Sequence, residues 1–479
     1  MTTTNHERLL TVAFLAGIAA TTATMTSFVS ARLEKPTKLR EPAGVATLRH
    51  GGEVHTWVAD THNNRVLHVS EAGDVVGVIG TGAFDFFGDG GDAAHAKLAW
   101  PHGVAARATS RAAAEHAQAS IALYIADTFN HRVRRVVDGR IETVAGNGKR
   151  GFRGDGGAAT SARLSHPHAV ALLPAPDSGH EDTIVSPAPT GKLVSPATSY
   201  SIWIADTYNN RIRRVDANGV ITTVVGTGAP AFAGDNGAAL DASLAWPMGL
   251  AVMPSARAPN SVVLLIADTY NHRVRAVSSA GIITTLAGDG KEGTNQDGPD
   301  ACQESLSHPF GIAAVRAEMG QDEFVVWFTD SSRHKLRQIG PNSALRTLAG
   351  AVWPGYYGDG GPADEAQMNE PKGLALVQGA QLNGREQTFE DNDAVNLLIA
   401  DSYNNAVRRV KTRERQGNER THAENNDPSG NHNTVRRLSN ADNTATPTMS
   451  FTHTPTPTAS VSFTHTPTPT ASVSFTHTP

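Results

Sequence analysis

One short segment recurs six times along the chain, and its regular spacing limits the fold more strongly than any other feature. The first three copies read WVADTHNNRVLHV, YIADTFNHRVRRV and WIADTYNNRIRRV. The aspartates shared by all copies are Asp60, Asp127, Asp206, Asp268, Asp330 and Asp401. Self-similarity of this kind is typical of proteins that repeat one structural unit.

A second segment recurs five times between copies of the first, as in GDGGDAAHAKLAWPHGVA from Gly88. Its aspartate follows that of the first segment by 28 or 29 residues and precedes a proline by 12 residues every time. Only the stretch from this proline to the next repeated aspartate varies, from 18 to 39 residues. Insertions are therefore confined to one connection in each repeat.

Each repeat reads as four short strands. In the second repeat they are GVAAR, YIAD, RVRRV and IETVAG, which are β-branched or aliphatic and are bounded by Gly, Asn and Asp. Helical repeats are disfavoured, because long segments with a 3.6-residue period are absent. The predicted fold class is all-β, a six-bladed β-propeller of four-stranded antiparallel blades with a disordered Thr/Pro-rich C-terminal tail.

Alternating connections in such a meander place the Asp-Thr turns and the GDGG loops on one face and the variable insertions on the opposite face. The fourth strand of the last blade has two candidates in the sequence. Residues 434–438 supply it from the C-terminal side, or residues 38–40 close the ring from the N-terminal side. The predicted propeller spans residues 42–410, with ring closure extending to about residue 440.

The repeated segments resemble the NHL repeat, in which an Asn-His-Arg-Val-Arg element follows an aliphatic-Ala-Asp strand. The resemblance covers Pro42 to Val410. It implies a six-bladed propeller, and it implies no single activity, because one fold carries many functions.

The six aspartates are predicted to have a structural role. A residue that occurs once per blade is spread around a ring and does not converge on one site, so we expect each carboxylate to accept hydrogen bonds from turn amides. The GDGG loops are expected to supply turn glycines and Ala and Leu side chains that pack between blades. The alternatives for these loops are weak anion binding or Ca²⁺ binding, and the loops with paired aspartates contain Asp89/Asp92, Asp297/Asp300 and Asp359/Asp364.

The residue after each proline opens the innermost strand and is expected near the central channel. These residues are Ala43, His102, His168, Met248, Phe310 and Lys372. Peptide-amidating lyases with similar propellers place zinc-binding histidines at comparable positions, so the resemblance implies a metal site at His102 and His168. A catalytic zinc usually has three protein ligands, and the third candidate, Met248, is a poor one. We therefore expect a polar channel lining and no cofactor, with zinc or calcium as the alternative.

The net charge of −5 gives no general attraction to nucleic acid, so DNA is not an expected partner. RNA binding is the remaining nucleic-acid alternative, because strand three carries the arginine pairs Arg134-Arg135 and Arg213-Arg214. The single cysteine, Cys302, excludes an intramolecular disulfide.

Both ends of the chain differ from the repeats. Residues 1–31 combine Arg8, an apolar run over residues 9–20 and a Val-Ser-Ala site, which predicts a cleaved signal peptide; an uncleaved membrane anchor is the alternative. Residues 411–449 are polar and predicted to be disordered. Residues 450–479 repeat SFTHTPTPTASV and resemble O-glycosylated stalks. The chain stops in mid-repeat, which leaves open a downstream domain or anchor.

These patterns favour a binding scaffold that is secreted or displayed at the cell surface and presents one face to a protein or glycan. The first alternative is a metal-dependent lyase or hydrolase that uses the central channel. The second is an RNA-binding protein. Membrane anchorage is the alternative location.

Overall fold

The computed structural model describes residues 38–109, 120–174, 200–255, 262–293, 296–316, 324–340, 342–377, 395–412 and 434–437. The predicted signal peptide, the predicted Thr/Pro tail and most of the predicted polar linker lie outside these ranges. Within the described ranges, no helix has the length and apolar character needed to cross a membrane.

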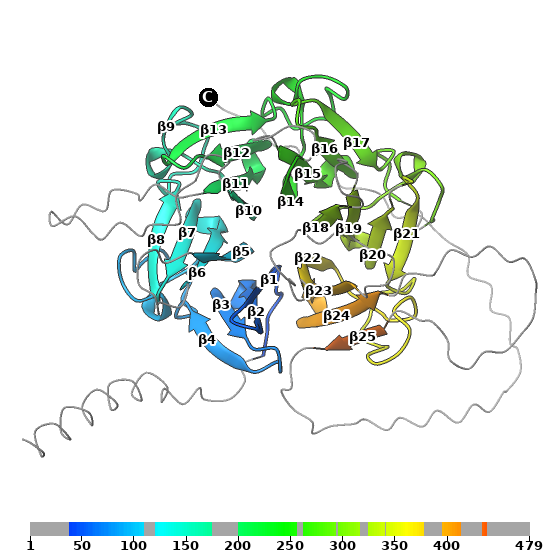
Figure 1. Ribbon diagram of the computed structural model, residues 1–479, viewed down its shortest axis with the longest axis horizontal. Helices are drawn as coiled ribbons and strands as arrows, with labels where there is room; N and C mark the ends of the chain where they lie inside the picture. The colour runs from blue at the N-terminus through cyan, green and yellow to red at the C-terminus, as the bar shows by residue number, and fades with distance from the viewer. Residues whose placement is uncertain are drawn as a thin grey trace, which may run out of the picture. The chain divides into compact units, whose positions relative to one another are not determined.

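Six antiparallel sheets follow one another around a ring and confirm the predicted six-bladed β-propeller (Figure 1). Blade one contains β1 (Gly44–His50), β2 (Glu53–Asp60), β3 (Arg65–Val69) and β4 (Val75–Ile79). Blade two contains β5 (Pro101–Thr109), β6 (Ser120–Asp127), β7 (Arg132–Val137) and β8 (Arg140–Ala145). Blade three contains β10 (Ala169–Pro174), β11 (Tyr200–Asp206), β12 (Arg211–Val215) and β13 (Val220–Val225), with β9 (Gly157–Ala158) added at its outer edge.

The other three blades repeat the same order. Blade four contains β14 (Pro247–Pro254), β15 (Val262–Asp268), β16 (Arg273–Val277) and β17 (Ile283–Ala287). Blade five contains β18 (Pro309–Arg316), β19 (Phe324–Asp330), β20 (Lys335–Ile339) and β21 (Leu345–Ala349). Blade six contains β22 (Pro371–Val377), β23 (Val395–Asp401), β24 (Ala406–Thr412) and β25 (Thr434–Arg437).

The fourth strand of blade six comes from the C-terminal side, which decides between the two alternatives left by the sequence. β25 pairs antiparallel with β24, with Val410 opposite Val435. Residues 38–40 lie instead at the turn of blade one, where the amide of His62 donates to the carbonyl of Arg40 at 3.1 Å.

Single turns of 3-10 helix mark both repeated segments. Those after the second strand of each blade are η1 (Thr61–Asn63), η3 (Thr128–Asn130), η5 (Thr207–Asn209), η7 (Thr269–Asn271), η9 (Ser331–Arg333) and η10 (Ser402–Asn404). Those in the GDGG loops are η2 (Ala93–His95), η4 (Ala159–Ser161), η6 (Ala239–Asp241) and η8 (Ala301–Gln303). The two sets lie on one face, because each turn contacts the loop before it, as when Asn130 donates to the Asp85 carbonyl at 2.8 Å.

The core lies between neighbouring blades, where the aliphatic side chains of alternating strand positions meet. The GDGG loops contribute to it as predicted: Ala93, Ala96 and Leu98 are at most 3% exposed and pack with side chains of blades one and two. Glycines allow the innermost strands to approach each other. A Cβ on Gly44 would lie 1.9 Å from the His102 carbonyl oxygen of the next blade, and one on Gly249 would lie 1.8 Å from that of Phe310.

Candidate functional site

The repeated aspartates are buried and bind groups outside their own turn amides. Asp206 Oδ1 accepts from the amide of Ser165, which precedes the first strand of the same blade, at 2.7 Å. Its Oδ2 accepts from the Asn209 side chain at 2.8 Å and from buried Arg213 at 3.2 Å. Burial raises the pKa of Asp206 to about 6, against the opposing effect of these donors. The carboxylate therefore ties the turn to the first strand, and the expected bonds to turn amides are absent here.

All six aspartates are placed in this way. Their Oδ1 atoms accept at 2.6–2.8 Å from the amides of Arg40, Ala99, Ser165, Ala245, Ser307 and Asn369. Because the six carboxylates are spread over six blades, they do not form one site.

The next residue of the motif joins each blade to the following one. Its hydroxyl donates to the carbonyl of the proline that opens the next blade, and Ser402 closes the circle by donating to Pro42 at 2.6 Å. The other five bonds, at 2.5–2.8 Å, are Thr61–Pro101, Thr128–Pro167, Thr207–Pro247, Thr269–Pro309 and Ser331–Pro371. In the Asp-Thr pair, the aspartate thus makes bonds within its blade and the hydroxyl makes a bond to the next blade.

The GDGG aspartates are held by the blade that follows each loop. Asp89 accepts from Arg134 at 2.7 Å and from Thr143 at 2.6 Å, and Asp92 accepts from the amide of Ala94 at 2.9 Å. The same arginine position binds Asp155, Asp235, Asp297 and Asp359 in the later blades. Five of the six carboxylates that the Ca²⁺ alternative relied on therefore have structural partners, and the sixth, Asp364, is exposed.

Three of the four arginines that motivated the RNA alternative are paired with acidic side chains. Arg134 and Arg213 are 0% exposed, and each pairs with two aspartates. Arg135 pairs with Glu142. These three side chains therefore do not form a basic surface for RNA.

Two positions of each repeat are left over by this framework, and their side chains meet on the face that carries the turns. One is the residue before each proline, and the other is the second residue after each aspartate. We call these twelve residues the crown: Glu41, Trp100, His166, Trp246, His308 and Glu370, with His62, Phe129, Tyr208, Tyr270, Ser332 and Tyr403. The six residues before proline all have φ between 44° and 56°, which L-residues adopt only where the surroundings fix it.

Eight crown rings form a continuous chain across blades one to five. Their order is His62, Trp100, Phe129, His166, Tyr208, Trp246, Tyr270 and His308. Successive ring centroids are 4.3–5.0 Å apart, which is the range of favourable aromatic contacts. Phe129 and Tyr270 remain 37% and 49% exposed, so the chain of rings presents an apolar surface to solvent.

The rest of the crown, over blades five, six and one, is polar. Ser332 Oγ lies 3.2 Å from His308 Nδ1, and the Glu41 carboxylate lies 3.0 Å from His62 Nδ1, so both ends of the ring chain meet polar groups. Glu41 and Glu370 both favour the charged form of Lys372, whose pKa is nevertheless lowered by burial. The crown therefore has an aromatic sector and an acidic sector.

The predicted channel-lining residues lie at the starts of the innermost strands, and two of them form a pair. The rings of His102 and His168 are 4.5 Å apart. The Nδ1 atoms lie 2.9 Å from the Trp100 carbonyl and 2.8 Å from the His166 carbonyl. A carbonyl only accepts, so each Nδ1 carries the proton and each Nε2 keeps a lone pair. Burial lowers the pKa of His168 to about 4 and that of His102 well below its usual value, so both rings are neutral at pH 7.

The other channel positions add no third nitrogen or oxygen ligand beside this pair. Met248 and Phe310 are half-buried at the starts of β14 and β18, and Ala43 is buried before β1. The ammonium of Lys372 lies 5.3 Å from the Tyr403 ring centroid and disfavours protonation of both histidines. Among the described residues, no group of three His, Cys, Asp or Glu side chains is placed to share one metal ion.

The sequence reasoning selected the position after each proline and missed the crown. The signal was present in the aligned repeats, because nine of the twelve crown residues are aromatic or histidine. It was overlooked because neighbouring crown residues come from different repeats.

No family model matches the sequence. Similar curated proteins are SUPPRESSOR OF QUENCHING 1 of Arabidopsis thaliana (28% identity over 301 residues, 60% of this chain and 24% of that protein) and NHL repeat-containing protein 2 of Bos taurus (25% identity, 47% and 30%). Teneurin-1 of Mus musculus is 25% identical over 57% of this chain and 10% of its own length. The chain thus spans less than a third of each of these relatives.

Solved structures with a similar course of the chain include a Bacteroides thetaiotaomicron protein of unknown function (TM-score 0.45, 15% identity, 78% of this chain and 70% of that chain). Another is virginiamycin B lyase of Staphylococcus aureus (TM-score 0.35, 14% identity, 74% and 77%). Similarity at this level carries no argument about activity. The repeated motif, the six-bladed ring and the NHL-repeat relatives together identify the chain as an NHL-repeat β-propeller protein.

Proposed function

We propose that this protein is a binding module and that the crown is its contact surface. The chain of eight rings from His62 to His308 is the observation that carries this proposal. The repeated Asp, Thr and Arg side chains are engaged in holding the ring of blades, whereas the crown side chains project from positions that this framework does not use.

The chemistry of the crown suits a protein or glycan ligand. Aromatic rings offer large, rigid contact areas with little loss of side-chain entropy, and they are common where proteins bind partners. The acidic sector around Glu41 and Glu370 adds acceptors for basic or hydroxyl groups. A ligand that lies across the face would contact rings of several blades at once.

Selection from a displayed peptide library and screening on a glycan array test this proposal with the full-length protein as bait. The crown variant is Phe129→Ser with Tyr270→Ser, because blade five already has Ser332 at the equivalent turn position. Val352→Ser serves as the matched control, since Val352 is 64% exposed in a loop outside the crown.

We expect any selected ligand to bind the crown variant at least tenfold more weakly and the control variant unchanged. The class of ligand recovered decides between protein and glycan. Ligands that bind wild type and crown variant equally would contradict the crown as the contact surface.

A second candidate function is a metal-dependent lyase or hydrolase at the channel. The observation that favours it is the pair of neutral imidazoles whose Nε2 atoms are kept unprotonated by the carbonyls of Trp100 and His166. Metal-binding histidines are commonly oriented by such a bond. Two donors are one fewer than a catalytic zinc usually has, so the site would need a further ligand from substrate or water.

Elemental mass spectrometry of the purified protein tests the second candidate. About one zinc or calcium per chain, lost in His102→Phe with His168→Phe, would support it. Metal content that is equal in wild type and variant, or absent from both, would contradict it.

We also propose that the protein is secreted or displayed at the cell surface. Support comes from the apolar run over residues 9–20 and the Thr/Pro repeats of residues 450–479. Cell fractionation followed by N-terminal sequencing of the mature protein tests this location. Recovery from the cytosol with residues 1–31 intact would contradict it.

A further inference from the structure

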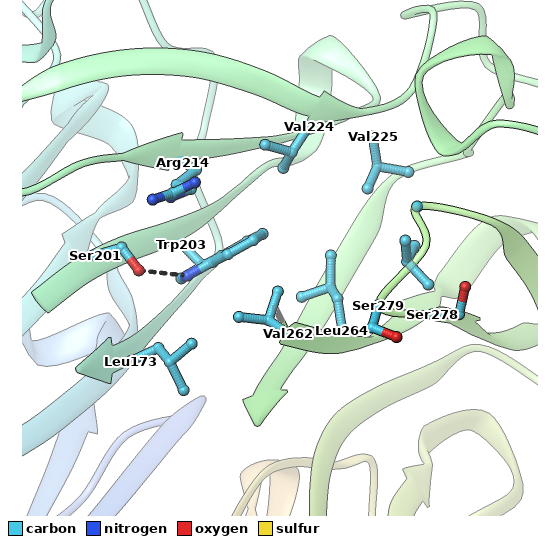
Figure 2. Close-up of a pocket in the computed structure, with 12 residues that line it drawn as sticks. Leu173, Ser201, Trp203, Arg214, Val224, Val225, Val262, Leu264, Ser278 and Ser279 are labelled. Atoms are coloured by element: carbon cyan, nitrogen blue, oxygen red, sulfur yellow. Dashed lines mark hydrogen bonds between the residues drawn. The ribbon is translucent and has the colours of Figure 1, made fainter. Parts of the chain in front are cut away.

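Blades three and four enclose a pocket that the proposed function does not use. Its volume is about 250 Å³, and β10, β11, β12 and β13 line it from blade three, while β15 and β16 line it from blade four. Trp203, Val262 and Leu264 form apolar walls, and Arg214 and Ser201 add polar groups (Figure 2). The pocket lies toward the end of the blades away from the crown, because it includes the last part of β10 and the first part of β11.

One difference between the repeats accounts for the open space at this interface. The position six residues before the repeated aspartate is Tyr200 in blade three and Val262 in blade four. Tyr200 is 3% exposed and fills the interface between blades two and three, whereas Val262 leaves the space in front of Trp203 unfilled.

The spacing at the axis also differs. Five blades have glycine two residues after the proline, and a Cβ there would lie 1.8–2.6 Å from a carbonyl oxygen of the next blade. Blade three has Ala169 at this position. The Cβ of Ala169 therefore needs room that a glycine at this position would not need.

Arg214 gives the pocket a cation without a partner. The guanidinium lies over the Trp203 ring, with Cζ 5.8 Å from its centroid. Across the strand pair it faces Thr222, whereas the equivalent Arg135 of blade two faces Glu142 and pairs with it. Arg214 has no hydrogen bond or ion pair within the described part of the chain, and its Nε is buried without an acceptor, as is that of the paired Arg135. A guanidinium without a carboxylate partner favours a ligand that brings an acceptor.

The neighbouring polar groups are compatible with an anionic ligand. Ser201 Oγ accepts from the indole Nε1 of Trp203 at 2.9 Å, which fixes the ring and leaves the serine hydroxyl proton as a further donor. Among the residues that the structure describes, no acidic side chain lines the pocket. The arrangement joins apolar walls to donors at one side, as small-molecule sites generally do.

We propose that this pocket binds a small carboxylate with an aromatic or branched apolar body, with Arg214 as the partner of the carboxylate and Trp203, Val262 and Leu264 around the body. The fork of donors in a guanidinium matches the two oxygens of a carboxylate. The volume is sufficient, since an apolar cavity of about 150 Å³ already accommodates benzene. This site is separate from the crown, so either one can exist without the other.

Isothermal titration and ligand-detected NMR with phenylacetate as the probe test the proposal on the full-length protein. Phenylacetamide, which is neutral and has the same shape, is the matched ligand control. Arg214→Gln removes the cation, and Val262→Tyr fills the pocket as Tyr200 fills its own interface. Arg346→Gln is the matched protein control, because Arg346 is at an exposed position of β21.

We expect saturable binding of phenylacetate to wild type and to Arg346→Gln, at least tenfold weaker binding of phenylacetamide, and at least a tenfold loss in Arg214→Gln. Binding is expected to disappear in Val262→Tyr. The proposal is overturned if phenylacetate fails to bind wild type, if the amide binds equally well, or if Arg214→Gln binds as wild type does. The last two comparisons stand even if Val262→Tyr does not fold.

Discussion

The interface between blades two and three and the interface between blades three and four are built from the same repeat, yet one is filled and the other contains a pocket. In the first, the hydroxyls of Tyr124 and Tyr200 are hydrogen-bonded, and the guanidinium of Arg107 lies 4.4 Å from the Tyr200 ring centroid. In the second, Trp203 stands opposite Val262 across open space. The repeated motif is intact in both.

This comparison shows that the repeated motif and the side chains between the blades act separately: the motif holds the blades together, and the side chains decide whether an interface is filled. The Asp, Thr and Asn side chains hold each blade to the next near the crown, so side chains further down the blade are free to differ. At that level a pair such as Arg135 and Glu142 or a single Arg214 is accommodated by the same backbone. A binding pocket can therefore arise at one interface without loss of the ring.

The largest expected effect is that of Tyr200→Val. This change gives the interface between blades two and three a valine, the residue type that Val262 supplies at the equivalent position of the interface between blades three and four. Removal of a buried aromatic ring and of the partner of the Tyr124 hydroxyl should lower the free energy of unfolding by about 4 kcal/mol. Denaturant unfolding of wild type and variant measures this difference in the free energy of unfolding. A loss below about 1 kcal/mol would show that this ring does not hold the interface together.

Acid should weaken the filled interface through His168, whose pKa burial lowers from 6.5 to about 4. Above pH 6.5 both folded and unfolded states hold a neutral ring. As the pH falls from 6.5 to 4 the unfolded state takes up a proton that the folded state does not, so stability is lost over this window. The difference in pKa corresponds to roughly 3 kcal/mol.

His168→Asn should therefore flatten the loss of stability between pH 6.5 and 4, as measured by urea unfolding at several pH values. His95→Asn is the control, because the His95 side chain is 80% exposed. If the free energy of unfolding of His168→Asn fell with pH as steeply as that of the wild type, the attribution of the acid effect to His168 would be wrong.

Exchanging the axial residues of the two interfaces should have unequal effects. A Cβ on Gly103 would lie 2.5 Å from the His168 carbonyl oxygen, so Gly103→Ala should cost about 2 kcal/mol through overpacking. Ala169→Gly introduces no clash and should cost about 0.5 to 1 kcal/mol through backbone entropy. Thermal unfolding of both variants checks this order. Equal melting temperatures would show that the close contact between Gly103 and the His168 carbonyl does not require a glycine.

A small effect, comparable to that of Ala169→Gly, is expected for Glu142→Thr, which removes the acid that pairs with Arg135 and leaves this arginine unpaired, like Arg214. Both partners are partly exposed, so the loss should be about 1 kcal/mol. Combined with Tyr200→Val, this change should create a second site for phenylacetate, whereas Tyr200→Val alone should not. Titration of both variants tests this, and binding to the single variant would show that an unpaired cation is not required.

Much of the framework was predictable from the sequence because its parts are local and repeated. Four short aliphatic segments in each repeat indicated four strands per blade, and a structural role for the repeated aspartates followed from their place beside a turn. The donors to that aspartate were not predictable, since the amide of Ala99 stands 28 residues away. The strand that closes blade six was ambiguous because residues 434–438 and residues 38–40 were both candidates for it.

The sequence by itself determined the number of blades and the place of the insertions, because both depend on the spacing of short repeated segments. Only the tertiary structure showed which side chains come together in the crown and which line the pocket. Trp100 meets His62 and Phe129 because curvature of the ring brings successive turns together. Arg214 is left unpaired because the acid present opposite Arg135 is missing and Val262 is short. Such features depend on which side chains of different blades meet across an interface.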